Sequence, residues 1–432
     1  TVEHAFKVGR FIGWYYGAAK DKSCKVVIGK DTRRSSYMFE YALVAGLTAS
    51  GADVYLLHVT TTPSVAYVVR TEEDFDCGIM ISASHNPYYD NGIKLINDRG
   101  EKMAEDVIAE IEAYLDGESG EVPLAYGEKI GCTVDYAAGR NRYIGYLITL
   151  ATRSYRGMRV GLDCSNGSAW MIAKSVFDAL GAKTYVINNE PDGLNINTNC
   201  GSTHIEGLQK YVVENHLDVG FAYDGDADRC LAVDERGELI DGDQIMAVCA
   251  EYLTAQGKLQ SEGFVATVMS NLGLHEFCRE NGVGLVCTSV GDRNVLEKMN
   301  ECGYKLGGEQ SGHTIFTDYA TTGDGQLTAL QFLDVLARSG KKASELASVC
   351  PQYPQVLLNV TVSHERGVKD AIMASDALSA AIAEEEGKLS GEGRVLVRPS
   401  GTEALIRVMV EAKTEQIALL AAENLVNVIK ML

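Results

Sequence analysis

One pattern of hydrophobic and polar positions occurs three times along the chain and predicts a strand, a helix and a second strand in each copy. Apolar runs mark the strands, and each helix has apolar residues at i, i+3 and i+4 spacing. Each helix also stops at or just before a glycine, which can take the left-handed conformation that helix ends favour. The predicted strand, helix and strand lie at 25–28, 38–49 and 51–56 in the first copy, at 159–162, 169–180 and 181–187 in the second, and at 264–268, 274–281 and 282–287 in the third.

A further apolar strand in each copy leads into a polar loop and is followed by a short apolar return. Strands that alternate with helices form parallel sheets through right-handed crossovers, and such sheets place ligands at the carboxyl ends of their strands. We therefore expect the three loops to lie at equivalent sheet edges and to converge on one cleft. The loops contain Ser82-Ala83-Ser84-His85-Asn86-Pro87, Asp224-Gly225-Asp226-Ala227-Asp228-Arg229 and Gly307-Gly308-Glu309-Gln310-Ser311-Gly312-His313, and the returns lie at 92–96, 230–233 and 314–316.

The pattern changes after Pro351 and Pro354, where a smaller α+β domain is predicted. Its strands are expected at 356–362, 394–397 and 405–410, with a helix near 368–384 and a closing amphipathic helix at 415–431. The predicted fold is therefore α/β, with three similar α/β domains with mixed sheets plus a C-terminal α+β domain, arranged around a central cleft. The expected domains are 1–138, 139–238, 239–350 and 351–432.

Length and composition are those of a globular protein with several domains. The 432 residues exceed what one hydrophobic core supports, and 46% hydrophobic with 23% charged residues is typical of soluble proteins. No apolar run approaches the length of a membrane span and the first residues carry no secretory pattern, so we expect a cytoplasmic protein with no membrane partner. The net charge of −20 argues against a nucleic-acid partner, which would need a basic face.

The eleven cysteines are scattered singly along the chain. There is no Cys-x-x-Cys pair and no Cys/His cluster at zinc spacing, so neither a disulfide framework nor a zinc site is predicted. We expect the cysteines to be small core residues.

Asp224, Asp226 and Asp228 place three carboxylates on alternate residues of a tight loop. These are enough hard oxygen ligands for Mg²⁺ or Ca²⁺. A calcium EF-hand does not fit, because Arg229 occupies the position where that loop needs glycine and a strand rather than a helix precedes the loop. A solvated acidic turn is the alternative, although clustered carboxylates repel one another unless a cation offsets them.

Ser84 is a candidate to carry a phosphate. No Gly-x-Ser-x-Gly elbow surrounds it and the adjacent His85 is poorly placed to deprotonate it, which argues against a hydrolase triad. A phosphoserine would offer anionic oxygens to the cation, which in turn would stabilise charge on the transferring phosphoryl group. Lys94, on the return strand, is a candidate proton donor or acceptor for a substrate hydroxyl, with an ordinary surface lysine as the alternative.

A basic loop near the C-terminus has the chemistry of a phosphate-binding site. It combines guanidinium groups, hydroxyls and a glycine that allows close backbone approach, although Pro-Ser-Gly is also ordinary turn chemistry. The loop has no evident catalytic acid, so we expect it to anchor a ligand. Its candidate residues are Arg398, Ser400, Gly401, Thr402 and Arg407.

The third polar loop has the chemistry of a sugar-binding site. Glu309 and Ser311 can hydrogen-bond vicinal hydroxyls. His313 could exchange a proton near neutral pH, and a structural histidine is the alternative.

Taken together, these motifs resemble those of the α-D-phosphohexomutases over nearly the whole chain. The resemblance implies four domains around a central cleft and an isomerase in which Ser84 is the phosphoserine. It also implies one Mg²⁺ per chain, held by Ser84, Asp224, Asp226 and Asp228. The four motifs occur in order as Ser82-Ala83-Ser84-His85-Asn86-Pro87, Asp224 to Arg229, Gly308-Glu309-Gln310-Ser311-Gly312-His313, and Arg398-Pro399-Ser400-Gly401-Thr402-Glu403.

The resemblance also implies a reaction. The phosphoserine would give its phosphoryl group to a hexose phosphate, the 1,6-bisphosphate would reorient, and the other phosphate would return to Ser84. Gln310, with Thr321-Thr322-Gly323-Asp324-Gly325 downstream, resembles the branch that converts glucosamine 6-phosphate to glucosamine 1-phosphate for UDP-N-acetylglucosamine synthesis, with hexosamine 1,6-bisphosphate as activator and intermediate. By family position, Lys94 and His313 would assist proton transfer, and His85, Asn86, Arg229, Glu309, Ser311, Arg398, Ser400, Gly401, Thr402 and Arg407 would bind the substrate.

Other interpretations stay open at this point. Within the family, the enzyme could be a phosphomannomutase or phosphoglucomutase. The chain opens at Thr1 inside a predicted helix, without the Gly-rich, arginine-bearing segment of the family, which leaves a non-catalytic phosphosugar-binding protein as an alternative. A phosphohydrolase that uses an aspartate of Asp224-Gly225-Asp226 as its nucleophile is another. The oligomeric state is also open, with a homodimer as one option.

Overall fold

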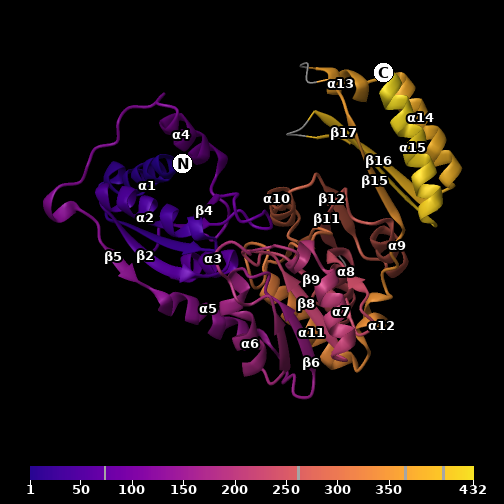
Figure 1. The fold of residues 1–432 in the computed structure, drawn as a ribbon, viewed down its shortest axis with the longest axis horizontal. Helices are drawn as coiled ribbons and strands as arrows, with labels where there is room; N and C mark the ends of the chain where they lie inside the picture. The colour runs from indigo at the N-terminus through magenta and orange to yellow at the C-terminus, as the bar shows by residue number, and fades with distance from the viewer. Residues whose placement is uncertain (73, 260–262, 364–366, 401–403) are drawn as a thin grey trace. The chain divides into compact units, whose positions relative to one another are not determined.

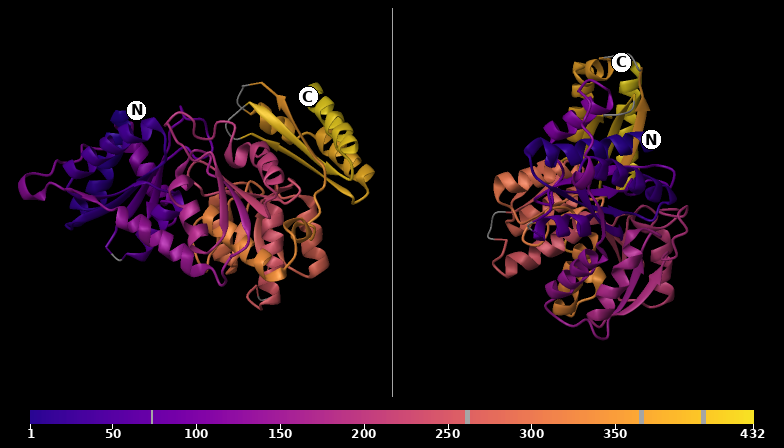
Figure 2. Two further views of the ribbon diagram at one scale, coloured as in Figure 1. Left: turned by 60° about the horizontal axis from the view of Figure 1, so that its bottom comes forward. Right: turned by 90° about the vertical axis from the view of Figure 1, so that its left-hand side faces the viewer.

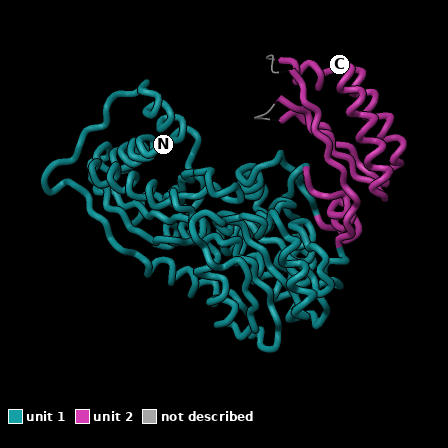
Figure 3. Tube along the Cα trace, viewed as in Figure 1, with its two compact units in different colours: residues 1–268, 284–349 teal, residues 269–283, 350–432 magenta. Residues whose placement is uncertain are grey.

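The computed structural model describes residues 1–72, 74–259, 263–363, 367–400 and 404–432 (Figure 1, Figure 2). The chain forms two compact units, shown in Figure 3: residues 1–268 with 284–349, and residues 269–283 with 350–432. No helix in these described ranges is long and apolar enough to cross a membrane.

Three of the four sheets share one topology, which confirms the repeat predicted from the hydrophobic pattern. In each, two parallel strands lie side by side, a third parallel strand pairs with the other edge of the first, and a fourth returns antiparallel beside the third. The strand orders are β4-β3-β1-β2-β5, β10-β9-β8-β6-β7 and β12-β11-β13-β14. The predicted class, three α/β domains with mixed sheets followed by a different C-terminal domain, is therefore confirmed.

The first sheet is covered by helices on both faces. Because successive strand residues point to opposite faces, Val26 and Ile28 of β1 pack in the core cluster with α1, α2 and α4, whereas Val27 packs in the cluster with α3. The elements are α1 (Val2–Tyr16), β1 (Cys24–Lys30), α2 (Arg34–Ala49), β2 (Ala52–Val59), α3 (Thr62–Thr71), β3 (Cys77–Ile81), β4 (Ile93–Asn97), α4 (Glu105–Leu115), β5 (Thr133–Asp135) and α5 (Ala137–Leu150).

The second sheet corrects one prediction. The helix expected at 169–180 is a 3-10 turn at Ser168–Met171 followed by the shorter α6 (Ala173–Ala179). The amide of Ser168 donates to the carbonyl of Gly225 at 2.8 Å, so a contact with a distant loop fixes the start of this segment and outweighs its helical periodicity. The other elements are β6 (Arg159–Asp163), β7 (Lys183–Ile187), α7 (Glu206–Glu214), β8 (Val219–Tyr223), β9 (Cys230–Asp234) and β10 (Leu239–Ile240).

The third sheet repeats the arrangement with shorter strands. Along the chain, α9 (Leu272–Asn281) lies between β11 and β12 and ends at Gly282, which has φ +67°, as expected for a glycine at a helix end. The remaining elements are α8 (Gly242–Ala255), β11 (Phe264–Thr267), β12 (Leu285–Thr288), α10 (Asp292–Cys302), β13 (Leu306–Gly308), β14 (Thr314–Phe316), α11 (Gly325–Ser339) and α12 (Ala343–Ala347).

The second unit contains an antiparallel sheet in the order β15-β17-β16, packed against helices. The single helix expected near 368–384 is instead two, because Ser375 has an extended backbone conformation that separates them. The closing helix is found as predicted. The elements are β15 (Gln355–Thr361), α13 (Val368–Met373), α14 (Asp376–Leu389), β16 (Gly393–Pro399), β17 (Leu405–Ala412) and α15 (Glu415–Met431).

A buried carboxylate explains why α9 belongs to the second unit. Glu411 of β17 is fully buried and accepts hydrogen bonds from the amide of Leu272 at 2.9 Å and from Arg394 Nε at 3.1 Å. The first turn of α9 is thereby fixed to the C-terminal sheet, and the pairing offsets the cost of burying the charge.

All eleven cysteines lie within the described residues and are free thiols. Most are buried. Cys132 and Cys287 are exposed, which corrects the expectation that every cysteine is a core residue.

Candidate active site

The first two polar loops meet at one point of the first unit. Each loop follows the third parallel strand of its sheet: the Ser84 loop lies between β3 and β4, and the Asp224 loop between β8 and β9. Ser84 Oγ donates a hydrogen bond to Asp224 Oδ2 at 2.5 Å. Two loops 140 residues apart in the sequence therefore place the candidate phosphate carrier against the candidate metal ligands.

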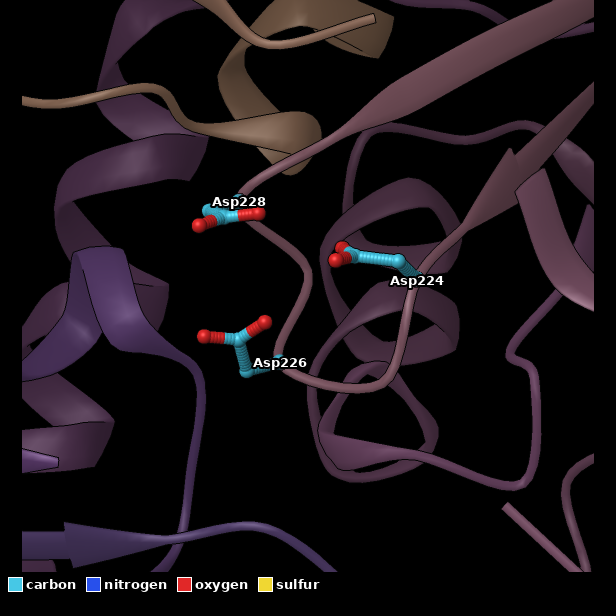
Figure 4. Close-up of side chains that lie close together, drawn as sticks. All are labelled: Asp224, Asp226 and Asp228. Atoms are coloured by element: carbon cyan, nitrogen blue, oxygen red, sulfur yellow. The ribbon is translucent and has the colours of Figure 1, made fainter. Parts of the chain in front are cut away.

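The carboxylates of Asp224, Asp226 and Asp228 face a common centre (Figure 4). All three residues are buried, and one ligand oxygen from each lies within 4.8 Å of the other two. Asp226 Oδ1 and Asp228 Oδ1 have no hydrogen-bond partner among the described residues. Burial, together with the charges of Asp228 and Asp226, holds the pKa of Asp224 well above its usual range. A divalent cation would coordinate the buried oxygens that lack partners and would offset the repulsion between the carboxylates. The cluster is therefore consistent with a metal site.

Lys94 lies beside the same carboxylates. Its ammonium hydrogen-bonds Asp226 Oδ2 and lies 3.0 Å from Asp228 Oδ2. Burial alone would lower the pKa of Lys94, but the two carboxylates outweigh burial and raise it. The two carboxylates therefore favour the charged form of Lys94 in this arrangement.

His313 is almost fully buried, and its ring lies near Asp228. The amide of Gly323 donates to His313 Nε2 at 3.1 Å, so a neutral ring carries its proton on Nδ1, which lies 3.9 Å from Asp228 Oδ2. The third polar loop thus approaches the metal loop at this histidine, and the amide of Cys230 donates to the carbonyl of Gly312 at 3.0 Å.

The other predicted residues of the first unit have different environments. Arg229 is partly buried, and its amide donates to Asp224 Oδ1 at 3.2 Å. Glu309 is buried and accepts from the amide of Gly291 at 3.1 Å, whereas Ser311 is exposed. His85 is exposed, and partial burial of its ring, with the charge of Arg229, lowers its pKa.

Three residues of the first unit that contact the site are missed by the sequence interpretation. Thr62, at the start of α3, donates from its hydroxyl to Asp226 Oδ2. Arg33 and Asn197 both donate to main-chain carbonyls of the Ser84 loop. A topological signal exists for Arg33: it follows β1, the central strand, at the same carboxyl edge as the Ser84 loop.

The predicted phosphate-binding residues lie in the second unit. Arg398 and Arg407 are directly opposite each other on β16 and β17, and burial together with the neighbouring Arg407 lowers the pKa of Arg398. Two adjacent guanidinium groups favour an anionic partner. Lys369, which the sequence interpretation misses, donates to the carbonyl of Ser400 at 2.6 Å. Gly401 and Thr402 lie outside the described residues.

Comparisons with known proteins identify the family of the chain. Residues 1–121, 141–237 and 241–353 match alpha/beta/alpha domains I, II and III of phosphoglucomutase/phosphomannomutase, and residues 357–428 match its C-terminal domain. A phosphoglucosamine mutase of Lachnospira eligens is 62% identical over 432 residues, which are 100% of this chain and 95% of the relative. The chain belongs to the phosphoglucomutase/phosphomannomutase family. The prediction of an isomerase of the phosphohexomutase class, of the phosphoglucosamine mutase type, is thereby confirmed.

Solved structures of this family share the fold. A phosphoglucomutase/phosphomannomutase family protein of Burkholderia thailandensis has a TM-score of 0.80 at 24% identity, and the match covers 100% of this chain and 94% of that one. An N-acetylphosphoglucosamine mutase of Aspergillus fumigatus, in complex with GlcNAc-6P and magnesium, has a TM-score of 0.68 at 20% identity, over 86% of this chain and 92% of that one.

The contact between the serine loop and the metal loop of this phosphohexomutase requires a glycine at position 225. A Cβ atom there would lie 2.5 Å from the Ser84 carbonyl oxygen. Gly225→Ala is therefore expected to push the two loops apart, to destabilise the protein by about 1–3 kcal/mol, and to reduce kcat about 10-fold or more by displacing Ser84. Thermal unfolding and steady-state kinetics measure both effects.

Gly207→Ala is the matched control, because a Cβ at that helical position meets no atom within 4 Å. It should leave kcat unchanged and leave stability unchanged or higher, since alanine favours the helix. Equal effects of the two substitutions would contradict the close approach as the cause.

Proposed function

We propose that the protein interconverts glucosamine 6-phosphate and glucosamine 1-phosphate through phosphorylated Ser84. The observation that carries the proposal is the 2.5 Å contact between Ser84 Oγ and Oδ2 of Asp224, which is one of the three clustered, buried aspartates. The identity of 62% to a phosphoglucosamine mutase over the whole chain supports the choice of glucosamine among the family's sugars.

The transfer runs in two balanced halves. A sugar hydroxyl attacks the phosphorus of phosphoserine 84 and loses its proton, and a new P–O bond to the sugar forms as the bond to Ser84 Oγ breaks and Ser84 Oγ takes up a proton. After the 1,6-bisphosphate reorients, the Ser84 hydroxyl attacks the other phosphate and loses its proton, and the P–O bond to the sugar breaks as the leaving sugar oxygen takes up a proton. Lys94 is the proposed proton donor for that oxygen, because its two carboxylate partners keep it charged. His313 is the second proposed proton-transfer group.

We propose that Asp224, Asp226, Asp228 and Ser84 hold one Mg²⁺ per chain. The unpartnered Asp226 Oδ1 and Asp228 Oδ1 favour a hard cation with oxygen ligands. When bound, Mg²⁺ supplies positive charge that stabilises the transferring phosphoryl group. The complex of the Aspergillus fumigatus relative with magnesium supports this choice of metal.

The remaining predicted residues would position the sugar phosphate. Glu309 and Ser311 would bind sugar hydroxyls, with His85, Asn86 and Arg229 nearby on the first two loops. In the second unit, Arg398 and Arg407 would hold the phosphate that does not react, together with Ser400, Gly401 and Thr402. The central cleft that would bring this loop to Ser84, the domain limits, the cytoplasmic location and a homodimer all stay predictions.

Substrate preference is the first test. With Mg²⁺ and a trace of the matching 1,6-bisphosphate, kcat/KM is expected to be at least about 10-fold higher for glucosamine 6-phosphate than for glucose 6-phosphate or mannose 6-phosphate, because a site that hydrogen-bonds one substituent rejects its analogues. Equal or higher values for either hexose would instead favour the phosphoglucomutase or phosphomannomutase activity.

The two alternatives from other classes make different predictions in the same assay. An aspartate-nucleophile phosphohydrolase would release inorganic phosphate, whereas a mutase converts 6-phosphate to 1-phosphate without release. A non-catalytic binding protein would be protected by substrate against thermal unfolding but would show no turnover.

A further inference from the structure

Two side chains from different sheets of the first unit hold the same pair of carbonyl groups in the Ser84 loop. Arg33 Nη2 donates to the carbonyl of Asn86 at 2.6 Å and to that of Ser84 at 3.3 Å. Asn197 Nδ2 donates to the carbonyl of Ser84 at 2.8 Å and to that of Asn86 at 3.0 Å. Each carbonyl therefore accepts from both side chains, one after β1 and the other after β7.

Arg33 is fixed before it reaches the loop. Its side chain is 1% exposed, its amide donates to Asp31 Oδ1 at 2.9 Å, and its guanidinium pairs with Asp31 Oδ2. Ser36 Oγ donates to the same Asp31 at 2.7 Å. A planar guanidinium held in this way presents its donors in one direction, which a flexible lysine would not.

Asn197 lies outside the helices and strands, and its own backbone conformation positions its side chain. It has φ +58°, a left-handed conformation that asparagine tolerates better than most residues, and its amide donates to the carbonyl of Ser165 at 2.9 Å. The residue is buried. The backbone and the surrounding packing therefore fix the direction of the side-chain amide that donates to the Ser84 loop.

One of the two held carbonyls belongs to Ser84, whose backbone conformation is strained. Ser84 has φ +51°, which is unfavourable for a residue other than glycine, and its amide donates to Ser82 Oγ at 3.0 Å. This conformation is the one in which Ser84 Oγ reaches Asp224 Oδ2. We propose that Arg33 and Asn197 are positioning residues that hold Ser84 in its left-handed conformation and so aim its hydroxyl and its phosphate at the metal loop.

The inference rests on the proposed function, because it assigns Arg33 and Asn197 to the placement of a phosphate carrier. Neither side chain contacts Ser84 Oγ in the described structure. Asn197 acts on the main chain of the loop, and Arg33 acts on the main chain and on Ser82 Oγ, which its Nη1 approaches to 3.4 Å. Loss of either should therefore reduce the rate of phosphoryl transfer in both directions and leave sugar binding nearly unchanged, whereas a merely structural role would lower stability without separating kcat from KM.

The test uses Asn197→Asp, which keeps the size and the left-handed tolerance of the residue but replaces the donor by an acceptor that faces two carbonyls. We expect kcat to fall about 100-fold, with KM for glucosamine 6-phosphate changed by less than about 3-fold. Arg33→Lys should reduce kcat by a smaller factor. The double variant should lose less than the product of the two factors, because both side chains act on the same carbonyls.

Asn195→Asp is the matched control. Asn195 lies two residues away, and its Nδ2 donates to the carbonyl of Glu190 at 3.0 Å, so the substitution removes the same kind of bond without touching the Ser84 loop. It should leave kcat unchanged. A kcat for Asn197→Asp equal to that of the wild type, or an equal loss of kcat in Asn195→Asp, would overturn the proposal. If Arg33→Lys does not fold, the result for Asn197→Asp decides the question.

Hydrogen exchange separates this inference from the proposed function. The amide of Ser84 should exchange faster in Asn197→Asp than in the wild type or in Asn195→Asp, whether or not Ser84 carries phosphate. Wild-type protein without phosphate on Ser84 during turnover would overturn the proposed function, and unchanged exchange of the Ser84 amide in Asn197→Asp would overturn the positioning role.

Discussion

Replacing Ser84 by alanine is expected to abolish mutase turnover, with kcat at least about 10⁴-fold lower, because the substitution removes the only proposed acceptor of the phosphoryl group. Alanine tolerates the left-handed conformation about as well as serine does, and Ala227 of the neighbouring loop has a φ of +56°. The fold should therefore persist, with a loss of about 1 kcal/mol from the hydrogen bond to Asp224. Steady-state kinetics and thermal unfolding measure the two effects.

Phosphopeptide mass spectrometry after incubation with glucosamine 1,6-bisphosphate supplies the decisive comparison. Wild-type protein should carry phosphate on Ser84, and Ser84→Ala should carry none. Ser339→Ala is a suitable control, because that hydroxyl lies at the end of α11, where it donates to the carbonyl of Leu336 at 3.1 Å and accepts from the amide of Lys341 at 3.1 Å. If Ser84→Ala retains even a hundredth of the wild-type kcat, phosphate transfer through this residue cannot be the reaction.

The features that the sequence predicts well are those with a local signal. The three strand–helix–strand copies follow from hydrophobic periodicity, and the three loops stand out because reactive side chains follow directly after buried strands. Ser84 and Asp224 come together because equivalent loops follow equivalent strands, which is a property of topology rather than of any single residue. Their contact could therefore be expected before the structure was known.

What the sequence does not reveal depends on contacts between distant segments. Arg33 lies in a polar stretch that resembles an exposed connection, yet it is buried through its contacts with Asp31 and with the distant Ser84 loop. Asn197 lies in a segment without periodicity. The crossover helix α3 is missed for another reason: Val65, Val68 and Val69 are β-branched and resemble a strand, yet they pack as one face of a helix.

The carboxylates of the metal loop are proposed to bind the metal, but their mutual repulsion destabilises the metal-free protein. Asp224→Asn is expected to lower kcat at least about 10³-fold, because it removes a proposed charged metal ligand. The same change should stabilise the protein in EDTA, raising the temperature of its first unfolding transition by about 2 °C, since burial and two neighbouring carboxylates disfavour the ionised form of Asp224.

The dependence on pH and metal separates this explanation from a general packing effect. The pKa of Asp224 is raised in the folded protein, so its ionisation penalises folding at a pH above that raised value and the penalty vanishes below the unfolded value of 3.8. The advantage of Asp224→Asn in EDTA should therefore shrink as the pH falls towards 4.

Saturating Mg²⁺ should make the wild type more stable than Asp224→Asn. A ligand stabilises the folded protein more the more tightly it binds, and the variant lacks one proposed ligand. Asp234→Asn serves as the control: Asp234 is also buried, but it accepts turn amides from Arg236 and Glu238 at 2.8 and 2.9 Å, so its replacement should destabilise the protein equally with and without Mg²⁺. In EDTA, an unfolding temperature of Asp224→Asn below that of the wild type would contradict this explanation. It would show that repulsion among the three aspartates does not destabilise the metal-free protein, which is the physical reason given for cation binding.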